Sequence, residues 1–183
     1  MNDTNTVPFV KWAGGKRQLL EHLSLRMPEE YTDYYEPFVG GGALLFHQKP
    51  AWAFINDINR ELIHTYTEIR DHMNPLAVLL SSMDQVTCTK EFYYEMRERY
   101  NDKLKAKDYD TEMAALFIYL NKHCFNGLYR VNQKGQFNVP WNQKEQVRSV
   151  DVENIKNISY YLKSVTITCQ DFEASLETAK KGD

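Results

Sequence analysis

The stretch Glu36-Pro37-Phe38-Val39-Gly40-Gly41-Gly42-Ala43 joins a short apolar run to three consecutive glycines, with a carboxylate just upstream. This pattern is typical of a first β-strand that turns directly into a helix. Three adjacent glycines remove side chains from the turn, so the backbone can reach positive φ and a ligand can approach the main chain closely. α/β proteins form ligand crevices in this way at the carboxyl ends of their strands. A simple tight turn is the alternative.

Two further strands are expected, and each ends in polar residues. After the first strand at residues 34–39, the pattern predicts strands at 52–55 and 165–169, which end in Asn56-Asp57 and Gln170-Asp171-Phe172. Helices are expected at residues 18–27, 43–49, 62–73, 76–83, 91–100, 112–122 and 155–162, and one after residue 172. The charged residues 101–110 predict an exposed connection. We therefore expect Glu36, Asp57 and Asp171 along the carboxyl edge of one sheet.

Asp57 has the spacing of a nucleoside-binding residue. It lies 21 residues past Glu36, and in nucleotide-binding βαβ units an acidic residue about 20 positions after the glycine turn accepts hydrogen bonds from ribose hydroxyls. The dinucleotide fingerprint does not fit, because Leu45 stands where its third glycine should be. A nucleoside without a pyrophosphate is the better match. The alternative for Asp57 is the N-cap of the next helix.

Residues 9–17 combine aromatic, glycine and basic residues. A P-loop is excluded, because Val10 stands where its first glycine belongs and Arg17 where a serine or threonine should hold magnesium. What remains is Trp12 between two lysines, Lys11 and Lys16, which suits stacking on a purine and neutralising a carboxylate or phosphate. A buried tryptophan beside two solvated lysines is the alternative.

The length of 183 residues suits one domain, or a core domain that carries a small insertion, and 43% hydrophobic and 13% aromatic side chains are enough for a folded core. The longest apolar run, residues 114–120, is too short to span a bilayer, and the N-terminus lacks the apolar stretch of a signal peptide. We therefore expect a cytoplasmic protein without membrane contact. The three cysteines show no paired spacing, so neither a disulfide framework nor a metal site is expected.

Residues 121–148 reverse the local charge, with five basic residues against one acid in a chain of net charge −3. Aromatic residues, asparagines and glutamines are interleaved with that charge. Arginine for guanine edges, asparagine and glutamine for adenine edges, and aromatic rings between bases are what a DNA-reading surface needs. Residues 129–139 also have the pattern of a β-hairpin, which can enter a groove. A merely solvated basic surface is the alternative.

Four motifs together resemble one family. They are Lys11-Trp12-Ala13-Gly14-Gly15-Lys16, the glycine turn with Glu36, Asn56-Asp57-Ile58-Asn59, and Asn126-Gly127-Leu128-Tyr129-Arg130-Val131-Asn132. Their order and spacing resemble those of Dam-type (alpha-class) DNA adenine-N6 methyltransferases over essentially the whole chain. The resemblance implies an α/β, Rossmann-like methyltransferase core with an incomplete sheet and a helical and β-hairpin DNA-recognition insertion. It implies core residues 1–72, insertion residues 73–150 and a return to the core at 151–183.

The resemblance implies S-adenosylmethionine as the cofactor and double-stranded DNA as the partner. Trp12 and Lys16 would help to hold the cofactor, Phe38 and Gly40 would lie along its methionine moiety, Asp57 would bind its ribose, and Asp171 and Phe172 would flank its adenine; Glu36 and Ile58 complete the implied cofactor set. Phe125 and Asn126 would prop the duplex open, Leu128 and Pro140 would touch thymine methyls, Arg130 would read a guanine, and Lys11 would reach an outer base pair; Asn132 completes the implied DNA set. The implied target is adenine in GATC.

One family element is missing from the sequence. Family enzymes orient the target adenine with an Asp-Pro-Pro-Tyr element, and no two of the six prolines here are adjacent. Asp183 is the last residue and could be mistaken for the first position of that element, but no prolines follow it, so we assign it no catalytic role. The resemblance implies that the element lies beyond Asp183.

We therefore expect a chain truncated before this element, without catalytic residues of its own and inactive alone. Two other functions stay open: a non-catalytic, S-adenosylmethionine-responsive DNA-binding module, and a small-molecule methyltransferase with the basic segment as a lid.

Overall fold

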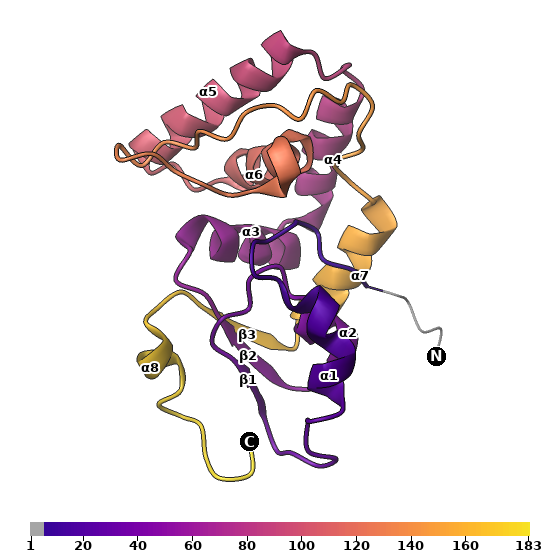
Figure 1. The fold of residues 1–183 in the computed structure, drawn as a ribbon, viewed down its shortest axis with the longest axis vertical. Coiled ribbons are helices and arrows are strands. Elements are labelled where there is room, and N and C mark those ends of the chain that lie inside the picture. Colours follow the sequence, from indigo (N-terminus) through magenta and orange to yellow (C-terminus); the bar gives the residue numbers. More distant parts are fainter. Residues whose placement is uncertain (1–5) are drawn as a thin grey trace.

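The computed structural model describes residues 6–183 as a mixed α/β structure built on a three-stranded parallel sheet. The elements, in chain order, are η1 (Lys16–Leu19), α1 (Leu20–Ser24), β1 (Tyr34–Glu36), α2 (Ala43–Gln48), β2 (Ala53–Asn56), α3 (Arg60–Asp71), α4 (Met73–Asp84), α5 (Lys90–Ala106), α6 (Thr111–His123), η2 (Phe125–Gly127), α7 (Val152–Leu162), β3 (Val165–Thr168) and α8 (Phe172–Ser175). In Figure 1 the sheet with α1 and α2 forms the lower half, and α4, α5 and α6 form the upper half.

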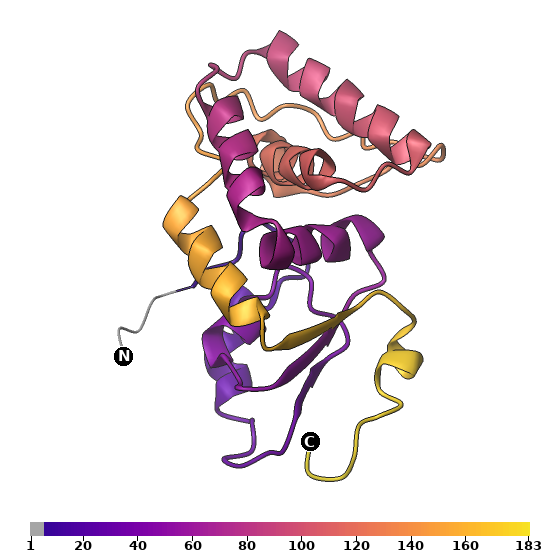
Figure 2. The ribbon, with the colours of Figure 1, turned by 180° about the vertical axis from the view of Figure 1, so that it is seen from behind.

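The strand order is β1-β2-β3, and both pairs are parallel. Ala53 of β2 stands opposite Tyr34 on one side and Val165 on the other, so the three strands start in register. Their carboxyl ends therefore meet at one edge, as expected for Glu36, Asp57 and Asp171. Seen from behind, α7 runs down from the upper half to the start of β3 (Figure 2).

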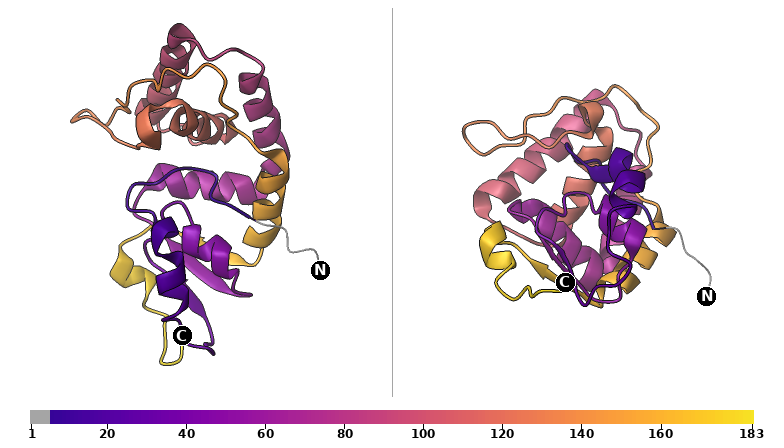
Figure 3. Two further views of the ribbon diagram at one scale, coloured as in Figure 1. Left: turned by 45° about the vertical axis from the view of Figure 1, so that its right-hand side comes forward. Right: turned by 60° about the horizontal axis from the view of Figure 1, so that its bottom comes forward.

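The two faces of the sheet are covered differently. Tyr34, Ala53, Ile55 and Val165 are buried in the core. The C-terminal segment with α8 lies on the other side of the sheet from α7 (Figure 3), where Tyr35 and Phe54 stack 4.6 Å apart.

Helix α6 is the centre of the upper half. All its residues from Met113 to Asn121 are buried, which explains why residues 114–120 are apolar without a helical period. Helices α3, α4 and α5 each pack against it. Asp110 caps its first turn by accepting a hydrogen bond from the Met113 amide at 2.8 Å.

Residues 101–110 differ from the sequence prediction. The expected exposed connection is wrong, because α5 continues to Ala106 and leaves only residues 107–110 outside a helix. Leu104 packs against the core, and Lys103 forms ion pairs with Asp108 and Asp110. Lysine, leucine and alanine are good helix formers, so the local charge marks a solvated helix face and not a loop.

The segment 124–150 crosses the upper half without regular strands. The expected hairpin at residues 129–139 is reduced to one antiparallel bridge between Val131 and Phe137, with backbone hydrogen bonds from Asn132 to Gln136 and from Asn138 to Arg130. We call residues 124–150 the basic loop. No helix within residues 6–183 is long and apolar enough to cross a membrane.

Candidate functional site

The glycine turn between β1 and α2 is packed against its own chain. Gly40 and Gly42 have φ values of +52° and +75°, in the left-handed region that favours glycine. A Cβ on Gly40 would lie 2.8 Å from Cδ1 of Trp12, and one on Gly42 would lie 2.5 Å from the Tyr66 hydroxyl. The glycines are therefore needed for packing, whether or not a ligand is bound.

Asp57 ties this turn to the end of β2. Its Oδ2 accepts a hydrogen bond from the Gly40 amide at 3.0 Å, and its Oδ1 accepts one from the Asn59 amide at 2.9 Å. The N-cap of α3 is Asn59, whose side chain accepts from the Leu62 amide. The alternative that Asp57 is the cap is therefore wrong. A carboxylate has about four acceptor positions, so Asp57 keeps capacity for two hydroxyl donors.

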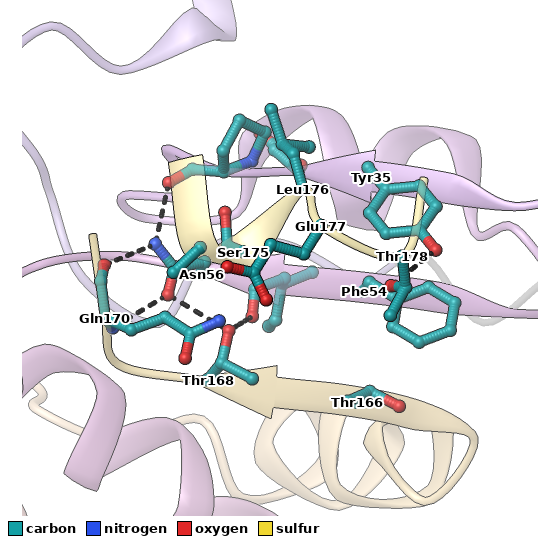
Figure 4. Close-up of a pocket in the computed structure, with 14 residues that line it drawn as sticks. Tyr35, Phe54, Asn56, Thr166, Thr168, Gln170, Ser175, Leu176, Glu177 and Thr178 are labelled. Carbon is teal, nitrogen blue, oxygen red and sulfur yellow. Dashed lines mark hydrogen bonds between the residues drawn. The ribbon is translucent and has the colours of Figure 1, made fainter. Parts of the chain in front are cut away.

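Asn56 holds the ends of all three strands together (Figure 4). Its Nδ2 donates to the carbonyls of Pro37 and Gln170 at 3.2 and 3.0 Å. Its Oδ1 accepts from the Gln170 amide and the Thr168 hydroxyl, both at 3.0 Å. The side chain is buried, so it fixes the positions of Asp57 and of the segment that follows β3.

Glu36 and Lys16 form a half-buried ion pair. Lys16 Nζ lies 3.0 Å from Glu36 Oε1 and donates to the Phe38 carbonyl at 2.7 Å. The Tyr34 hydroxyl donates to Glu36 Oε2 at 2.7 Å. Burial raises the pKa of Glu36, although Lys16 and Tyr34 oppose the rise. Glu36 therefore fixes the position of the Lys16 ammonium group.

A crevice of about 1060 Å³ opens beside this turn. Its lining includes Trp12, Lys16, Phe38, Gly40, Asp57 and Lys122. Glu36 lines a different pocket, of about 300 Å³, on the side of the sheet shown in Figure 4. The larger crevice is of the size that holds a nucleoside-sized ligand.

The outer wall of the crevice is basic. Lys11 is exposed and Lys122 is half-buried. Burial, and to a smaller extent the charge of Lys11, lower the pKa of Lys122. Two neighbouring lysines favour an anionic ligand, so this wall suits a phosphate or carboxylate.

Trp12 joins the crevice to the basic loop. Its ring stacks on Tyr129 with centroids 5.7 Å apart and planes 19° apart. Lys16 is paired with Glu36. The alternative of a buried tryptophan beside two solvated lysines therefore does not hold for Lys16. Trp12 itself is half-buried.

Comparisons with known proteins assign the family. Residues 12–183 match the family described as D12 class N6 adenine-specific DNA methyltransferase. The chain belongs to this family. It is 44% identical to the type II methyltransferase M1.LlaDCHI of Lactococcus lactis subsp. cremoris over 100% of the chain and 64% of that protein. It is 41% identical to the type II methyltransferase M.MjaIII of Methanocaldococcus jannaschii over 91% of the chain and 62% of that protein.

A third relative, the DNA adenine methylase of Haemophilus influenzae, is 29% identical over 95% of the chain and 60% of its own length. The chain thus spans less than two thirds of the length of these three methyltransferases. The match to the D12 family covers the glycine turn, Asp57, the basic loop and the C-terminal segment. A family of DNA methyltransferases implies DNA as the substrate of its members and, in general, S-adenosylmethionine as their cofactor.

Some of the cofactor residues that the resemblance implies line the crevice, and the others lie outside its lining. Trp12, Lys16, Phe38, Gly40 and Asp57 line the crevice. Phe172 lies next to them, because its ring contacts Phe38 at 5.5 Å. Ile58 and Asp171 are exposed outside the crevice lining. Asp171 also caps the short helix α8 by accepting from the Glu173 amide at 2.9 Å.

Asp183, to which we assigned no catalytic role, lies outside the crevice lining and is exposed. Its Oδ2 accepts a hydrogen bond from the Lys180 amide at 2.6 Å, within the same turn of the chain. The neighbouring Gly182 carbonyl accepts from the Thr32 amide at 2.8 Å, which holds this turn beside the segment that precedes β1. The contacts of the Asp183 carboxylate are thus local, and the expectation that catalytic residues lie beyond Asp183 stays a prediction.

Most of the implied DNA residues are on the surface of the basic loop. Phe125, Asn126, Arg130 and Pro140 are exposed, and Leu128 is half-buried against the core. Asn126 has a φ of +56°, so η2 is interrupted there. Arg130 Nε donates to Asn138 Oδ1 at 2.8 Å, which holds its guanidinium along the loop.

Asn132 and Lys11 have additional structural roles. The Asn132 side-chain oxygen accepts from the amides of Lys134 and Gln136 at 2.9 and 3.0 Å, so it shapes the tip of the loop. The backbone of Lys11 is bound on both sides by the buried Asn121 side chain, whose amide group also donates to the Gly127 carbonyl at 3.0 Å.

Sequence reasoning missed the residues that position the site. Asn56 was considered only as part of the Asn56-Asp57-Ile58-Asn59 motif, and Asn121 and Lys122 only as members of the basic segment 121–148. A buried amide and a lysine at the end of an apolar helix are signals that could have drawn attention. Tyr66 lies within the expected helix 62–73 and had no role assigned, yet its hydroxyl donates to the Gly40 carbonyl at 2.9 Å. Each acts through a partner far away in the sequence, which a single sequence does not reveal.

Proposed function

We propose that this chain binds S-adenosylmethionine in the crevice beside the glycine turn and double-stranded DNA along the basic loop, as part of an enzyme that methylates adenine N6. One observation carries the proposal. Lys11 and Lys122 line the same crevice as Trp12, Gly40 and Asp57, so a bound nucleoside and a DNA strand would meet there.

The crevice has the groups that the cofactor requires. Asp57 can accept hydrogen bonds from ribose hydroxyls with its free acceptor positions. Lys16 uses two of its three donor positions on Glu36 and the Phe38 carbonyl, which leaves one for a carboxylate. Phe172 offers an apolar surface for the adenine, and Phe38, whose ring contacts that of Phe172 at 5.5 Å, lies toward the methionine moiety. When bound, the cofactor supplies an electrophilic methyl group on a sulfonium.

The target base has to leave the helix. The lone pair of the adenine amino group is delocalised into the ring, so the base is flipped out and oriented before methyl transfer. We propose that Phe125 and Asn126 enter the duplex, that Leu128 and Pro140 contact thymine methyls, and that Arg130 reads a guanine in a GATC site. Residues 73–150 would thus form a recognition insertion, and residues 1–72 and 151–183 the core. These 183 residues contain no Asp-Pro-Pro-Tyr element, so we propose that alone they do not transfer the methyl group.

Two binding measurements test this proposal. Calorimetry with S-adenosylhomocysteine, the product of methyl transfer, should show binding that Asp57→Ala weakens at least about tenfold, the effect of losing charge-assisted hydrogen bonds. A mobility shift with GATC duplexes should show binding that Arg130→Ala weakens most at one guanine position, by about 10- to 100-fold. Lys163→Ala, on an exposed lysine remote from both surfaces, is the matched control.

The outcomes separate the functions that remain open. Tritiated methyl transfer to GATC duplex by these 183 residues would contradict the proposed need for a further element. In a second outcome, the protein binds S-adenosylhomocysteine and DNA but transfers no methyl group, even when the segment of a related methyltransferase that this chain does not cover is added. That result would favour a non-catalytic DNA-binding module. Cofactor binding with no DNA affinity would instead favour a small-molecule methyltransferase.

A further inference from the structure

Tyr129 lies where the crevice and the basic loop meet. We propose that it is a positioning residue that couples occupancy of the crevice to the DNA-binding geometry of the loop. This inference rests on the proposed function, because it takes the crevice as the cofactor site and the loop as the DNA-facing surface.

The first contact is aromatic. Tyr129 stacks on Trp12, and its ring also contacts Phe117 of α6 at 5.3 Å and Phe137 of the basic loop at 5.7 Å. Trp12 in turn presses against the glycine turn, where a Cβ on Gly40 would overlap its ring. Any shift of Trp12 on ligand binding is therefore transmitted directly to the loop.

The second contact is polar. The Tyr129 hydroxyl lies 3.4 Å from Glu61 Oε2 and 3.4 Å from the Tyr100 hydroxyl. Tyr109 donates to the other oxygen of Glu61 at 2.9 Å. Glu61 is in the first turn of α3, four residues after Asp57. Burial, followed by the charge of Glu61, raises the pKa of Tyr129, so the hydroxyl stays protonated and remains a donor.

The loop has little freedom to absorb a movement of Tyr129. Arg130 is its direct neighbour, and the backbone amide of Asn138 donates to the Arg130 carbonyl at 3.1 Å. On the other side, Asn121 joins the backbones of Lys11 and Gly127. A displaced Tyr129 ring therefore shifts the position from which Arg130 reaches the DNA.

Coupling of this kind is reciprocal. If cofactor binding favours the loop arrangement that binds DNA, DNA binding must favour the cofactor by the same factor. Removing the stack should reduce this factor without abolishing either binding event. A residue that only filled the core would change stability and leave the factor unchanged.

The experiment measures DNA affinity with and without saturating S-adenosylhomocysteine, using the full-length protein and a GATC duplex. The coupling factor is the ratio of the two dissociation constants. Tyr129→Leu keeps an apolar side chain but loses the stacked ring, and Tyr129→Phe keeps the ring but loses the hydroxyl. Tyr160→Leu, on a side chain that is 85% exposed on α7, is the matched control.

We expect S-adenosylhomocysteine to tighten DNA binding by the wild-type protein. Tyr129→Leu should lower that coupling factor by about 2- to 10-fold, the range that corresponds to one lost aromatic pair. Tyr129→Phe should keep most of the factor, and Tyr160→Leu all of it. Circular dichroism confirms that each variant is folded. If Tyr129→Leu is not, Tyr129→Met, which also lacks a ring, is measured in its place and should lower the coupling factor in the same way.

Three results overturn the inference. A wild-type factor of one means that the two sites are independent. An unchanged factor in Tyr129→Leu, which lacks the stacked ring, means that the coupling runs elsewhere. Failure of the wild-type protein to bind S-adenosylhomocysteine or DNA overturns the proposed function and, with it, this inference, whereas the first two results leave the proposed function intact.

Discussion

Replacing Asn56 by alanine should separate the three strand ends from one another. The substitution removes the side-chain partner of three main-chain groups: the carbonyls of Pro37 and Gln170 and the Gln170 amide. The Thr168 hydroxyl keeps a second partner in the Ile55 carbonyl. At about 1 kcal/mol for each lost hydrogen bond, the free energy of unfolding should fall by about 3 kcal/mol. Domains of this size have about 5–15 kcal/mol in total.

Urea denaturation followed by circular dichroism measures this loss. Asn56→Asp is a second variant of nearly the same shape, and at pH 7 its carboxylate faces two carbonyl oxygens, so its loss should be at least as large. Gln133→Ala, on an exposed amide of the basic loop, is the control and should stay within about 0.5 kcal/mol. Affinity for S-adenosylhomocysteine should fall in both Asn56 variants, because Asp57 is the next residue.

A loss of less than about 1 kcal/mol for Asn56→Ala would refute this reasoning. It would mean that the strand ends are held by the sheet and its helices alone. Wild-type stability with weakened ligand binding would show that the Asn56 hydrogen bonds position Asp57 but do not stabilise the sheet.

Three further changes test other parts of the site. Gly42→Ala places a Cβ against the side chains of Tyr66 and Phe46 at a positive φ, and should cost more than about 2 kcal/mol in urea denaturation. Glu36→Gln removes a carboxyl group whose pKa is raised in the folded state. The free energy of unfolding of the wild type should therefore fall relative to that of this variant as the pH rises from about 4.5. Urea titrations of both proteins at a series of pH values measure the difference. Asn121→Leu should raise backbone hydrogen exchange in residues 124–150, as mass spectrometry can show. It removes one hydrogen bond to the Gly127 carbonyl in this segment and two to the backbone of Lys11, so it breaks the link between the segment and the N-terminal stretch.

The sign for Glu36 follows from linkage. A carboxyl with a raised folded-state pKa binds its proton more tightly in the folded than in the unfolded protein. Its contribution to stability is therefore present at low pH and lost between the unfolded and the folded pKa. A constant difference between wild type and Glu36→Gln across pH would contradict the raised pKa. For Gly42, an alanine variant of wild-type stability would show that the turn can move; for Asn121, exchange unchanged from wild type would show that the loop is held elsewhere.

The sequence predicted the ends of β2 and β3 to within one residue, because polar residues follow their short β-branched or aromatic runs. The first strand was predicted to reach residue 39 but ends at Glu36, so the apolar residues before the glycines belong to the turn. The parallel sheet places Glu36, Asp57 and Asp171 on one edge, as expected. Because the residues near Leu104 are charged, the sequence predicted a helix that ends at residue 100, whereas α5 continues to Ala106. Charge alone does not distinguish a helix face from a loop. The hairpin pattern of the basic loop was overridden by side chains such as Asn132, which hold its tip without a strand ladder.

What the sequence could not reveal are the contacts between remote residues. The Trp12–Tyr129 stack and the hydrogen bonds from Asn121 to Lys11 join segments that are more than 100 residues apart. No local pattern encodes such a pair, because its two partners lie in different segments of the sequence. Conversely, the glycines of the turn read as a ligand-binding device, and the structure shows that Trp12 and Tyr66 already require them.

The link between Asn121 and Lys11 also has a consequence for the order of folding. These residues are 110 positions apart, so the loop-closure entropy of this contact is lost before the contact itself can stabilise the chain. The backbone hydrogen bonds within helix α6 are local, whereas the N-terminal stretch needs the end of this helix to dock on. The N-terminal wall of the crevice should therefore be among the last parts of the protein to fold. A nucleoside ligand in the crevice would contact this wall and would therefore slow its unfolding.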